Sequence, residues 1–251
     1  MKYLGSKSRL AKHILPIVLE HRNECGWYIE PFIGGANMID KVPTASVVLL
    51  GGDSNFYLIE MWKALVGGWI PPKISRDKYQ EIRIGLKNGE HKAEPAMIGW
   101  AGIACSYSGR WFEGYAGETK TKEGNVRDYQ KEAFNNVKKQ LSALSRVNFI
   151  HSDYRNIQTP HRSIIYCDPP YRNTKKYHQD FNHDKFWKWA EGKARYGHHV
   201  YVSEYEAPEG WKCVWEGVVS SSLRANGIIK GSKKTTERLF VFDLQALTSN
   251  K

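Results

Sequence analysis

The sequence is poor in cysteine and has none of the short spacings that are typical of metal sites. Its 251 residues include four cysteines, which are Cys25, Cys105, Cys167 and Cys213. They are far apart and form no CxxC pair, and the nine histidines form no HExxH-type pair. His198 and His199 are interpreted as the beginning of a strand. These absences predict a protein without a metal site, in a reduced cytosolic setting.

Long apolar runs are also missing from the sequence. None approaches the roughly 20 residues that a helix needs to cross a bilayer. Residues 1–22 contain an apolar stretch, but Lys12, His13 and Pro16 interrupt it and no small-residue cleavage site follows. We therefore expect a soluble protein with no signal peptide and no membrane partner.

The composition is that of a folded protein with an excess of positive charge. Hydrophobic residues make up 41% of the chain and aromatic residues 13%. Lysine and arginine outnumber aspartate and glutamate by 37 to 26, which gives a net charge of +11. The excess favours a polyanionic partner, although ribosomal-type, membrane-surface and nucleotide-binding proteins share it.

The hydrophobic pattern alternates between predicted strands and predicted helices. We expect strands over residues 27–32, 47–53, 147–153, 163–168, 198–205, 211–219 and 237–244. We expect helices over residues 8–21, 55–65, 130–145 and 183–196. Pro16 is expected to kink or divide the first helix. The alternation predicts an α/β fold with a doubly wound, mainly parallel, seven-stranded sheet.

Residues 67–129 differ in composition from the rest of the chain. They are rich in glycine, lysine and tryptophan and contain no strong strand pattern. A stretch of this length inside a compact domain is usually functional or forms an inserted subdomain. We predict one domain made of residues 1–66 and 130–251, interrupted at 67–129 by a mostly helical inserted subdomain.

The tetrapeptide DPPY follows one of the predicted strands directly. Residues 163–167 are short, β-branched and aromatic, as in a buried strand. Proline cannot donate to a sheet ladder, so Pro169 and Pro170 lie beyond the end of the strand. Asp168 and Tyr171 are therefore expected at the carboxyl end of a strand, where open α/β sheets bind ligands. An ordinary strand exit with an Asp–Pro turn explains the tetrapeptide equally well.

This tetrapeptide suits chemistry at an exocyclic amine such as N6 of adenine. That nitrogen is a poor nucleophile, because its lone pair is delocalised into the ring. Acceptors on its N–H bonds would stabilise the positive charge that develops on attack. Asp168 offers a carboxylate, Pro169 a carbonyl in a fixed conformation, and Tyr171 a ring that can stack on a base. A methyl group from a sulfonium cofactor would complete the reaction without a metal.

A second pattern indicates a nucleoside cofactor. Gly34 and Gly35 come directly after the first predicted strand, where they allow a sharp turn and close approach to a ligand. Asp53 ends the second strand, where an acid can accept hydrogen bonds from both ribose hydroxyls. The alternative is that Asp53 caps the helix that begins near Asn55. No GxGxxG is present, so NAD is not favoured.

Five motifs in one order carry a resemblance to a known family. KYLGSK, EPFIGGANM, GGDSN, FIHSDY and DPPY resemble the Dam-like (D12 class) DNA adenine-N6 methyltransferases, which use S-adenosylmethionine. The resemblance extends from Lys2 to the predicted strand at 235–242. It implies a methyltransferase-type sheet, and it implies that residues 67–129 are the target-recognition region.

The resemblance also implies roles for individual residues. In KYLGSK, Tyr3 and Lys7 would contact the methionine end of the cofactor or nearby parts, and Lys2 would reach the DNA. From the residue alone, Lys7 is equally an exposed lysine at the start of a helix.

Further motifs assign the rest of the cofactor site. Phe32, Gly34 and Gly35 match the glycine-rich cofactor turn, and Asp53 matches the acid that binds the ribose. Ala36 stands where many relatives have a third glycine, which tightens the turn without abolishing binding.

The remaining roles concern residues near the predicted catalytic strand. Asp153 resembles an acid near the adenine of the cofactor, with a helix N-cap as the alternative. Asp168 would also contact the cofactor, besides acting with Pro169, Pro170 and Tyr171 as the catalytic set. Ser203 resembles a later motif of the family.

The inserted segment offers a hypothesis for DNA recognition. Arg110 can contact guanine in the major groove, whereas Trp111 can wedge into the base stack. Lys120 and Lys122 are expected to contact phosphates. The alternative is that the aromatic residues of this segment are simply the core of a small subdomain.

These observations predict site-specific methyl transfer from S-adenosylmethionine to adenine N6 in double-stranded DNA, with base flipping. An RNA or protein methyltransferase with the same DPPY chemistry is the nearest alternative. A catalytically silent DNA-binding module of the same fold is another, and a dehydrogenase would leave DPPY unexplained. By family analogy we expect the cytoplasm of a bacterial host or phage-infected cell, and no metal. The sequence does not predict the oligomeric state.

Overall fold

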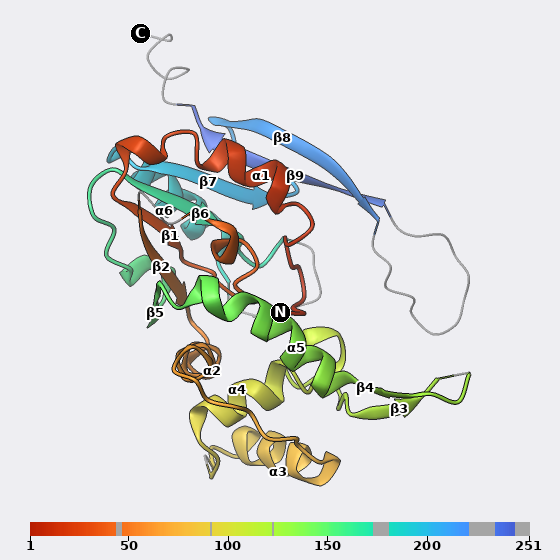
Figure 1. Cartoon of the computed structure of the whole chain (residues 1–251). Coiled ribbons are helices and arrows are strands. Elements are labelled where there is room, and N and C mark those ends of the chain that lie inside the picture. The colour runs from red at the N-terminus through yellow and green to blue at the C-terminus, as the bar shows by residue number, and fades with distance from the viewer. Residues whose placement is uncertain (44–46, 91, 122, 173–180, 221–233, 244–251) are drawn as a thin grey trace, which may run out of the picture. The chain divides into compact units, whose positions relative to one another are not determined.

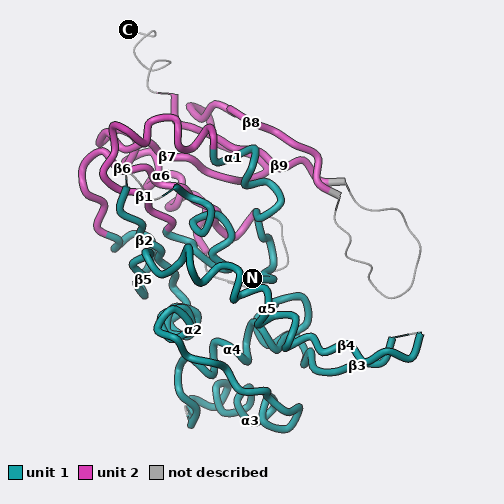
Figure 2. Tube along the Cα trace, viewed as in Figure 1, with its two compact units in different colours: residues 1–15, 31–157 teal, residues 16–30, 158–251 magenta. Residues whose placement is uncertain are grey.

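The computed structural model describes residues 1–43, 47–90, 92–121, 123–172, 181–220 and 234–243. The chain divides into two compact units (Figure 2). The first unit contains residues 1–15 and 31–157, and the second contains residues 16–30 and 158–251. None of the described helices is long and apolar enough to cross a bilayer.

All seven predicted strands are present in one sheet (Figure 1). They are β1 (Trp27–Glu30), β2 (Val48–Asp53), β5 (Val147–His151), β6 (Ser163–Cys167), β7 (His199–Glu204), β8 (Trp211–Ser220) and β9 (Lys234–Phe242). Their order in the sheet is β5-β2-β1-β6-β7-β9-β8. Strand β2 pairs with β5, and β6 with β1 and β7, in parallel, whereas β9 pairs antiparallel with β7 and β8. The predicted α/β fold with a mainly parallel seven-stranded sheet is confirmed.

The described residues form six α-helices. They are α1 (Ala11–Val18), α2 (Phe56–Val66), α3 (Arg76–Lys87), α4 (Pro95–Ile103), α5 (Tyr129–Leu144) and α6 (His183–Arg195). Pro16 lies inside α1 and does not divide it. The carbonyl that a proline leaves unpaired belongs to the residue four positions earlier, here Lys12, and both Lys12 and Pro16 are exposed residues.

The first unit has its core where α2 packs against α4. Leu58, Met61 and Trp62 of α2 are fully buried. The two helices approach closely at Gly99, because a Cβ atom there would lie only 2.1 Å from the carbonyl oxygen of Tyr57. The segment 67–129 adds α3, α4 and a small hairpin of β3 (Glu118–Lys120) and β4 (Val126–Asp128). It belongs to the same compact unit as β2 and β5, and its interpretation as an inserted subdomain stays a prediction.

The second unit is built around β6 and β7. All five residues of β6 are buried, and so are five of the six residues of β7. Phe186 and Trp187 of α6 and Leu239 of β9 contribute further buried side chains. Because β6 is buried along its whole length, the residue that follows it is held at a fixed point by the core.

Candidate active site

The glycine-rich turn after β1 lies directly against the amino-terminal segment of the first unit. Gly34 has a φ of +45°, in the left-handed region that favours glycine. A Cβ atom on Gly34 would lie 2.7 Å from a ring carbon of Tyr3, and one on Gly35 would lie 2.6 Å from the Tyr3 Cβ atom. The Trp62 indole donates to the Gly34 carbonyl oxygen at 3.0 Å. The structure thus brings together Tyr3, Gly34 and Gly35, which the family resemblance assigns to the cofactor.

Asp53 connects this turn to the end of β2. Its Oδ2 accepts a hydrogen bond from the Gly34 amide at 3.1 Å, and its Oδ1 accepts one from the Asn55 amide at 2.9 Å. The cap of α2 is Asn55, whose side chain accepts from the Leu58 amide. The alternative in which Asp53 merely caps this helix is therefore wrong. Two backbone donors instead orient the carboxylate at the carboxyl end of a parallel strand.

Lys7 is buried, with a relative exposure of 5%, although it precedes α1. Its Nζ donates to the Gly5 carbonyl oxygen at 3.1 Å. An exposed lysine at the start of a helix, which the residue alone would allow, is thus excluded. Burial of an ammonium group is costly unless it is paired, so this position is not interchangeable with a surface lysine. Lys2, in contrast, is exposed.

Asp153 is the N-cap of a 3-10 helix, η4 (Tyr154–Asn156). Its carboxylate accepts from the Arg155 amide at 2.9 Å and from the Arg155 guanidinium at 2.8 and 3.0 Å. This guanidinium holds the pKa of Asp153 below its ordinary value. Tyr154 packs against Phe32, with ring centroids 5.3 Å apart. The capping role of Asp153 is confirmed, and its contact with the adenine of a cofactor stays a prediction.

The DPPY tetrapeptide follows β6 in the second unit. Asp168 is half-buried and Pro169 is buried. The Tyr171 hydroxyl donates to Glu237 Oε2 of β9 at 2.8 Å, and the Tyr205 ring meets the Tyr171 ring edge-to-face at 4.7 Å. Burial, followed by the charge of Asp168, raises the pKa of Tyr171 well above its ordinary value. The hydroxyl therefore stays protonated and remains a hydrogen-bond donor.

Two further side chains fix the backbone around this tetrapeptide. Glu204 is buried at the end of β7 and accepts from the amides of Arg172 at 2.8 Å and Tyr205 at 2.6 Å. Ser203 is also buried, and its hydroxyl lies 2.8 Å from that of Tyr166. Glu204 and Glu237 were missed by the sequence reasoning. In the sequence, each of these acids stands in a predicted strand. Glu204 follows the apolar residues of VYVSEY, and Glu237 lies within TTERLFVF.

Glu237 is expected to position the Tyr171 ring for stacking. Glu237→Ala should lower the rate of methyl transfer to DNA about tenfold, because a hydrogen bond with a charged partner contributes about 1.5 kcal/mol or more. Glu237→Gln keeps an acceptor and should restore most of the rate. Single-turnover rates would measure both effects.

The matched control for this prediction is Tyr171→Phe, which keeps the ring and removes the hydroxyl. In the Tyr171→Phe background, Glu237→Ala should have little further effect. Independent, additive losses from the two substitutions would contradict the positioning role.

The residues predicted for DNA recognition occupy different environments. Arg110 pairs with Glu113 at 3.0 Å and has a side-chain exposure of 24%. Trp111 stacks on Tyr57 of α2, with ring centroids 6.1 Å apart. Lys120 is exposed on β3, whereas Lys122 lies outside the described residues.

The aromatic residues of this segment are in part a core. Phe112 and Tyr79 are buried, and their ring centroids lie 5.4 Å apart. Tyr115 contacts Tyr79 at the same centroid distance, 5.4 Å. Tyr107, in contrast, is 57% exposed. The core interpretation thus holds for Phe112 and Tyr79, while the DNA-contacting role of Arg110 and Trp111 stays a prediction.

Arg110→Ala should weaken the discrimination between cognate and altered DNA sites by roughly 1–3 kcal/mol, as for loss of a base contact. Lys120→Ala should lower the affinity for all sequences alike and reduce the salt slope by about one unit. Affinities for cognate and scrambled duplexes at several salt concentrations would separate the two.

Glu113→Gln is the matched variant, because it releases the Arg110 guanidinium from its ion pair. It should tighten DNA binding in the wild-type background and have no such effect in Arg110→Ala. Intact site preference in Arg110→Ala would assign recognition to other residues.

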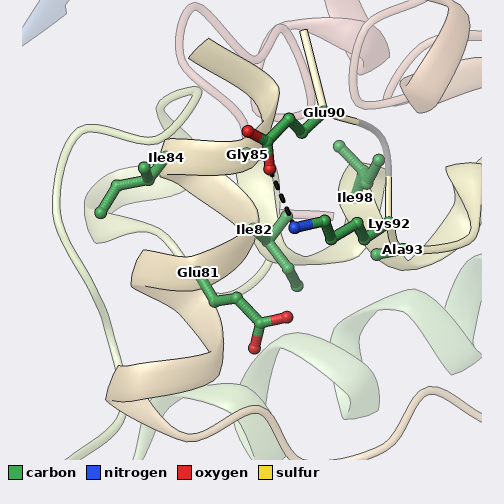
Figure 3. A pocket seen from close by; sticks show the side chains of 8 residues that line it. All are labelled: Glu81, Ile82, Ile84, Gly85, Glu90, Lys92, Ala93 and Ile98. Atoms are coloured by element: carbon green, nitrogen blue, oxygen red, sulfur yellow. Dashed lines mark ion pairs between the residues drawn. The ribbon is translucent and has the colours of Figure 1, made fainter. Parts of the chain in front are cut away.

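A separate hollow of about 390 Å³ lies in the segment between α3 and α4 (Figure 3). Glu90 and Lys92 form an ion pair of 2.9 Å at its edge. The hollow is lined by Glu81, Ile82, Ile84, Gly85, Glu90, Lys92, Ala93 and Ile98. None of the predicted site residues lines it.

One of the comparisons with known proteins, the match to a family model, agrees with the motifs. No curated protein matches the chain. Among solved structures, the chain is similar to SMU.472, a protein assigned to the methyltransferases and solved in complex with SAH, at 10% identity and a TM-score of 0.37. That match covers 96% of this chain and 53% of SMU.472, so the chain spans about half the length of that protein. The model of the D12 class N6 adenine-specific DNA methyltransferases matches residues 3–209, and the chain belongs to this family.

Proposed function

We propose that the protein transfers a methyl group from S-adenosylmethionine to N6 of adenine in double-stranded DNA. Family membership supports the reaction class. The observation that carries the proposal is the arrangement after β6, where Asp168 follows a fully buried strand. There, Glu237 and Tyr205 hold the ring of Tyr171.

This arrangement suits an exocyclic amine. The carboxylate of Asp168 and the carbonyl of Pro169 are the acceptors for its two N–H bonds, which brings the nitrogen lone pair out of conjugation. Tyr171 stacks on the base, a contact that contributes roughly 1–3 kcal/mol. Its hydroxyl is occupied by Glu237, so the ring acts as a surface for stacking and not as an acid.

The residues of the first unit fit a nucleoside cofactor. The Gly34–Gly35 turn has no room for a Cβ atom beside Tyr3, and Asp53 is oriented by two amides. We assign the ribose hydroxyls to Asp53, as in other sheets with an acid at this position. Tyr3, Lys7 and Phe32 complete the set, and Asp153 is assigned to the adenine. S-adenosylmethionine, when bound, supplies the electrophilic methyl group.

Double-stranded DNA is the proposed partner, and its adenine must leave the base stack to reach Asp168. Flipping costs a few kcal/mol. The net charge of +11 supports phosphate contacts that offset this cost. We assign the choice of target site to the segment 67–129, and we expect the protein to act in the cytoplasm of a bacterial or phage-infected cell.

The test is direct measurement of the methylated product. Purified protein and radiolabelled S-adenosylmethionine would be incubated together with duplex DNA, with single-stranded RNA or with a protein extract, each in a separate reaction. N6-methyladenine in duplex DNA, located by methylation-sensitive sequencing, is the expected result. Label found only in RNA or protein would overturn the substrate, and DNA binding without cofactor binding would indicate a catalytically silent module.

A further inference from the structure

Ala36, which closes the glycine-rich turn after β1, has a backbone conformation that is typical of glycine. Its φ is +51°, in the left-handed region, and the residue is fully buried. Its amide donates to the Ile33 carbonyl oxygen at 2.8 Å. Glycine adopts this region readily, whereas a residue with a Cβ atom does so only at a cost in free energy. The turn therefore depends on surrounding groups that hold Ala36 in place.

The side chain of Gln140 on α5 is such a group. It is buried, with a relative exposure of 6%. Its amide nitrogen donates to the Ala36 carbonyl oxygen at 3.1 Å and to Asp40 Oδ2 at 3.0 Å. An amide nitrogen carries two hydrogens, so each of them has an acceptor here. Asp40 belongs to a 3-10 helix, η2 (Ile39–Lys41), that packs against α5. Gln140 thus links the turn both to α5 and to the segment that follows it.

Neighbouring polar groups are paired as well. The Oε1 atom of Gln140 accepts from the amino group of Met1. The Asn37 side chain donates to the Met1 carbonyl oxygen at 3.0 Å, and Lys41 Nζ donates to the Asn37 carbonyl oxygen at 2.8 Å. The carbonyls of Ala36 and Asn37 are therefore each held by a long side chain from outside the turn. Loss of the Gln140 donor would remove one of these two anchors.

We propose that Gln140 is a positioning residue for the cofactor, and that it acts through the Ala36 carbonyl by holding the glycine-rich turn in the conformation that binds. This inference rests on the proposed function, which assigns Gly34 and Gly35 to S-adenosylmethionine. Without the Gln140 donor, Ala36 spends more time outside the left-handed region. Only the fraction of molecules with the closed turn then binds the cofactor, and the apparent affinity falls by that fraction.

Gln140→Met tests this role, because it keeps the length of the side chain and removes its donor. The Kd for S-adenosylmethionine should rise about tenfold, the loss expected when a buried carbonyl is left without its donor. The rate of methyl transfer at saturating cofactor should stay within about twofold of the parent, since bound cofactor restores the turn. Titration calorimetry and single-turnover rates would measure the two quantities.

Gln130→Met is the matched control. Gln130 is another buried glutamine of α5, and its side chain bonds both the amide and the carbonyl of Ile74, at 2.9 and 2.8 Å. The substitution makes the same chemical change on the same helix, so it should lower the melting temperature. It should leave the Kd for S-adenosylmethionine unchanged. An equal rise in Kd in both variants would reduce the effect of Gln140 to general destabilisation and overturn the proposal.

Ala36→Gly tests whether Gln140 acts through this residue. Glycine needs no help to adopt the left-handed region, so in this background Gln140→Met should raise the Kd only about twofold. A side chain that served only to hold Met1 would cause the same loss in both backgrounds, which would contradict the proposal. Equal Kd values in the parent and in Gln140→Met would overturn this inference alone. A parent protein that binds no S-adenosylmethionine would overturn the proposed function together with it.

Discussion

Asp168→Ala is expected to abolish methyl transfer while the affinity for S-adenosylmethionine stays within about tenfold. Loss of one preorganised acceptor costs on the order of 3–4 kcal/mol in the barrier, which corresponds to a rate reduced by about 10²–10³. Its placement directly after buried β6 supports this role. Initial rates with duplex DNA and calorimetric titration with the cofactor would measure the two quantities separately.

Glu206→Ala is the control for this substitution, because Glu206 is an exposed acid of the same unit. It should retain the wild-type rate. If Asp168→Ala keeps more than about a tenth of the wild-type rate, the carboxylate is not the acceptor that activates the amine. A rate loss that disappears at saturating cofactor would instead assign Asp168 to cofactor binding.

Asp53→Ala should act on the cofactor and much less on the rate at saturation. The substitution removes a charged acceptor from the two ribose hydroxyls, and each such hydrogen bond contributes about 1.5–3 kcal/mol. The Kd for S-adenosylmethionine should therefore rise about 100-fold or more. It also removes the acceptor of the Gly34 and Asn55 amides, so the melting temperature should fall as well.

Asn55→Ala separates these two consequences. It deletes the cap that accepts from Leu58, which costs about 1 kcal/mol of stability, and leaves the Asp53 carboxylate in place. Cofactor affinity should stay close to wild type in this variant. An unchanged Kd in Asp53→Ala, with only a lower melting temperature, would show that Asp53 is structural.

The strands could be predicted well from the sequence because their signals are local. Residues 163–167 and 198–205 are short apolar runs with clear breakers at their ends, and β6 and β7 match them within one residue. Of the two outcomes expected for Pro16, division of the helix is wrong, since α1 continues past it, and a kink stays a prediction.

Residues of the candidate site could be predicted from the sequence only where they stand next to one another in a motif. DPPY and the Gly34–Gly35 turn were recognisable because their residues are consecutive. Glu237 lies 66 positions after Tyr171, and only strand pairing brings them together. Long-range contacts of this kind leave no periodicity in a single sequence.

The close approach of Gly99 to the Tyr57 carbonyl has a consequence for engineering. Methyltransferases with new target sites could be sought by exchanging the segment 67–129 between relatives as a cassette. Gly99 of α4, which lies inside this segment, packs against the first turn of α2, which lies outside it. A Cβ atom at position 99 would collide with the carbonyl oxygen of Tyr57. That same turn follows Asn55, whose amide binds Asp53. A workable chimaera therefore needs its upstream junction before α2, so that donor helices α2 and α4 are inherited together.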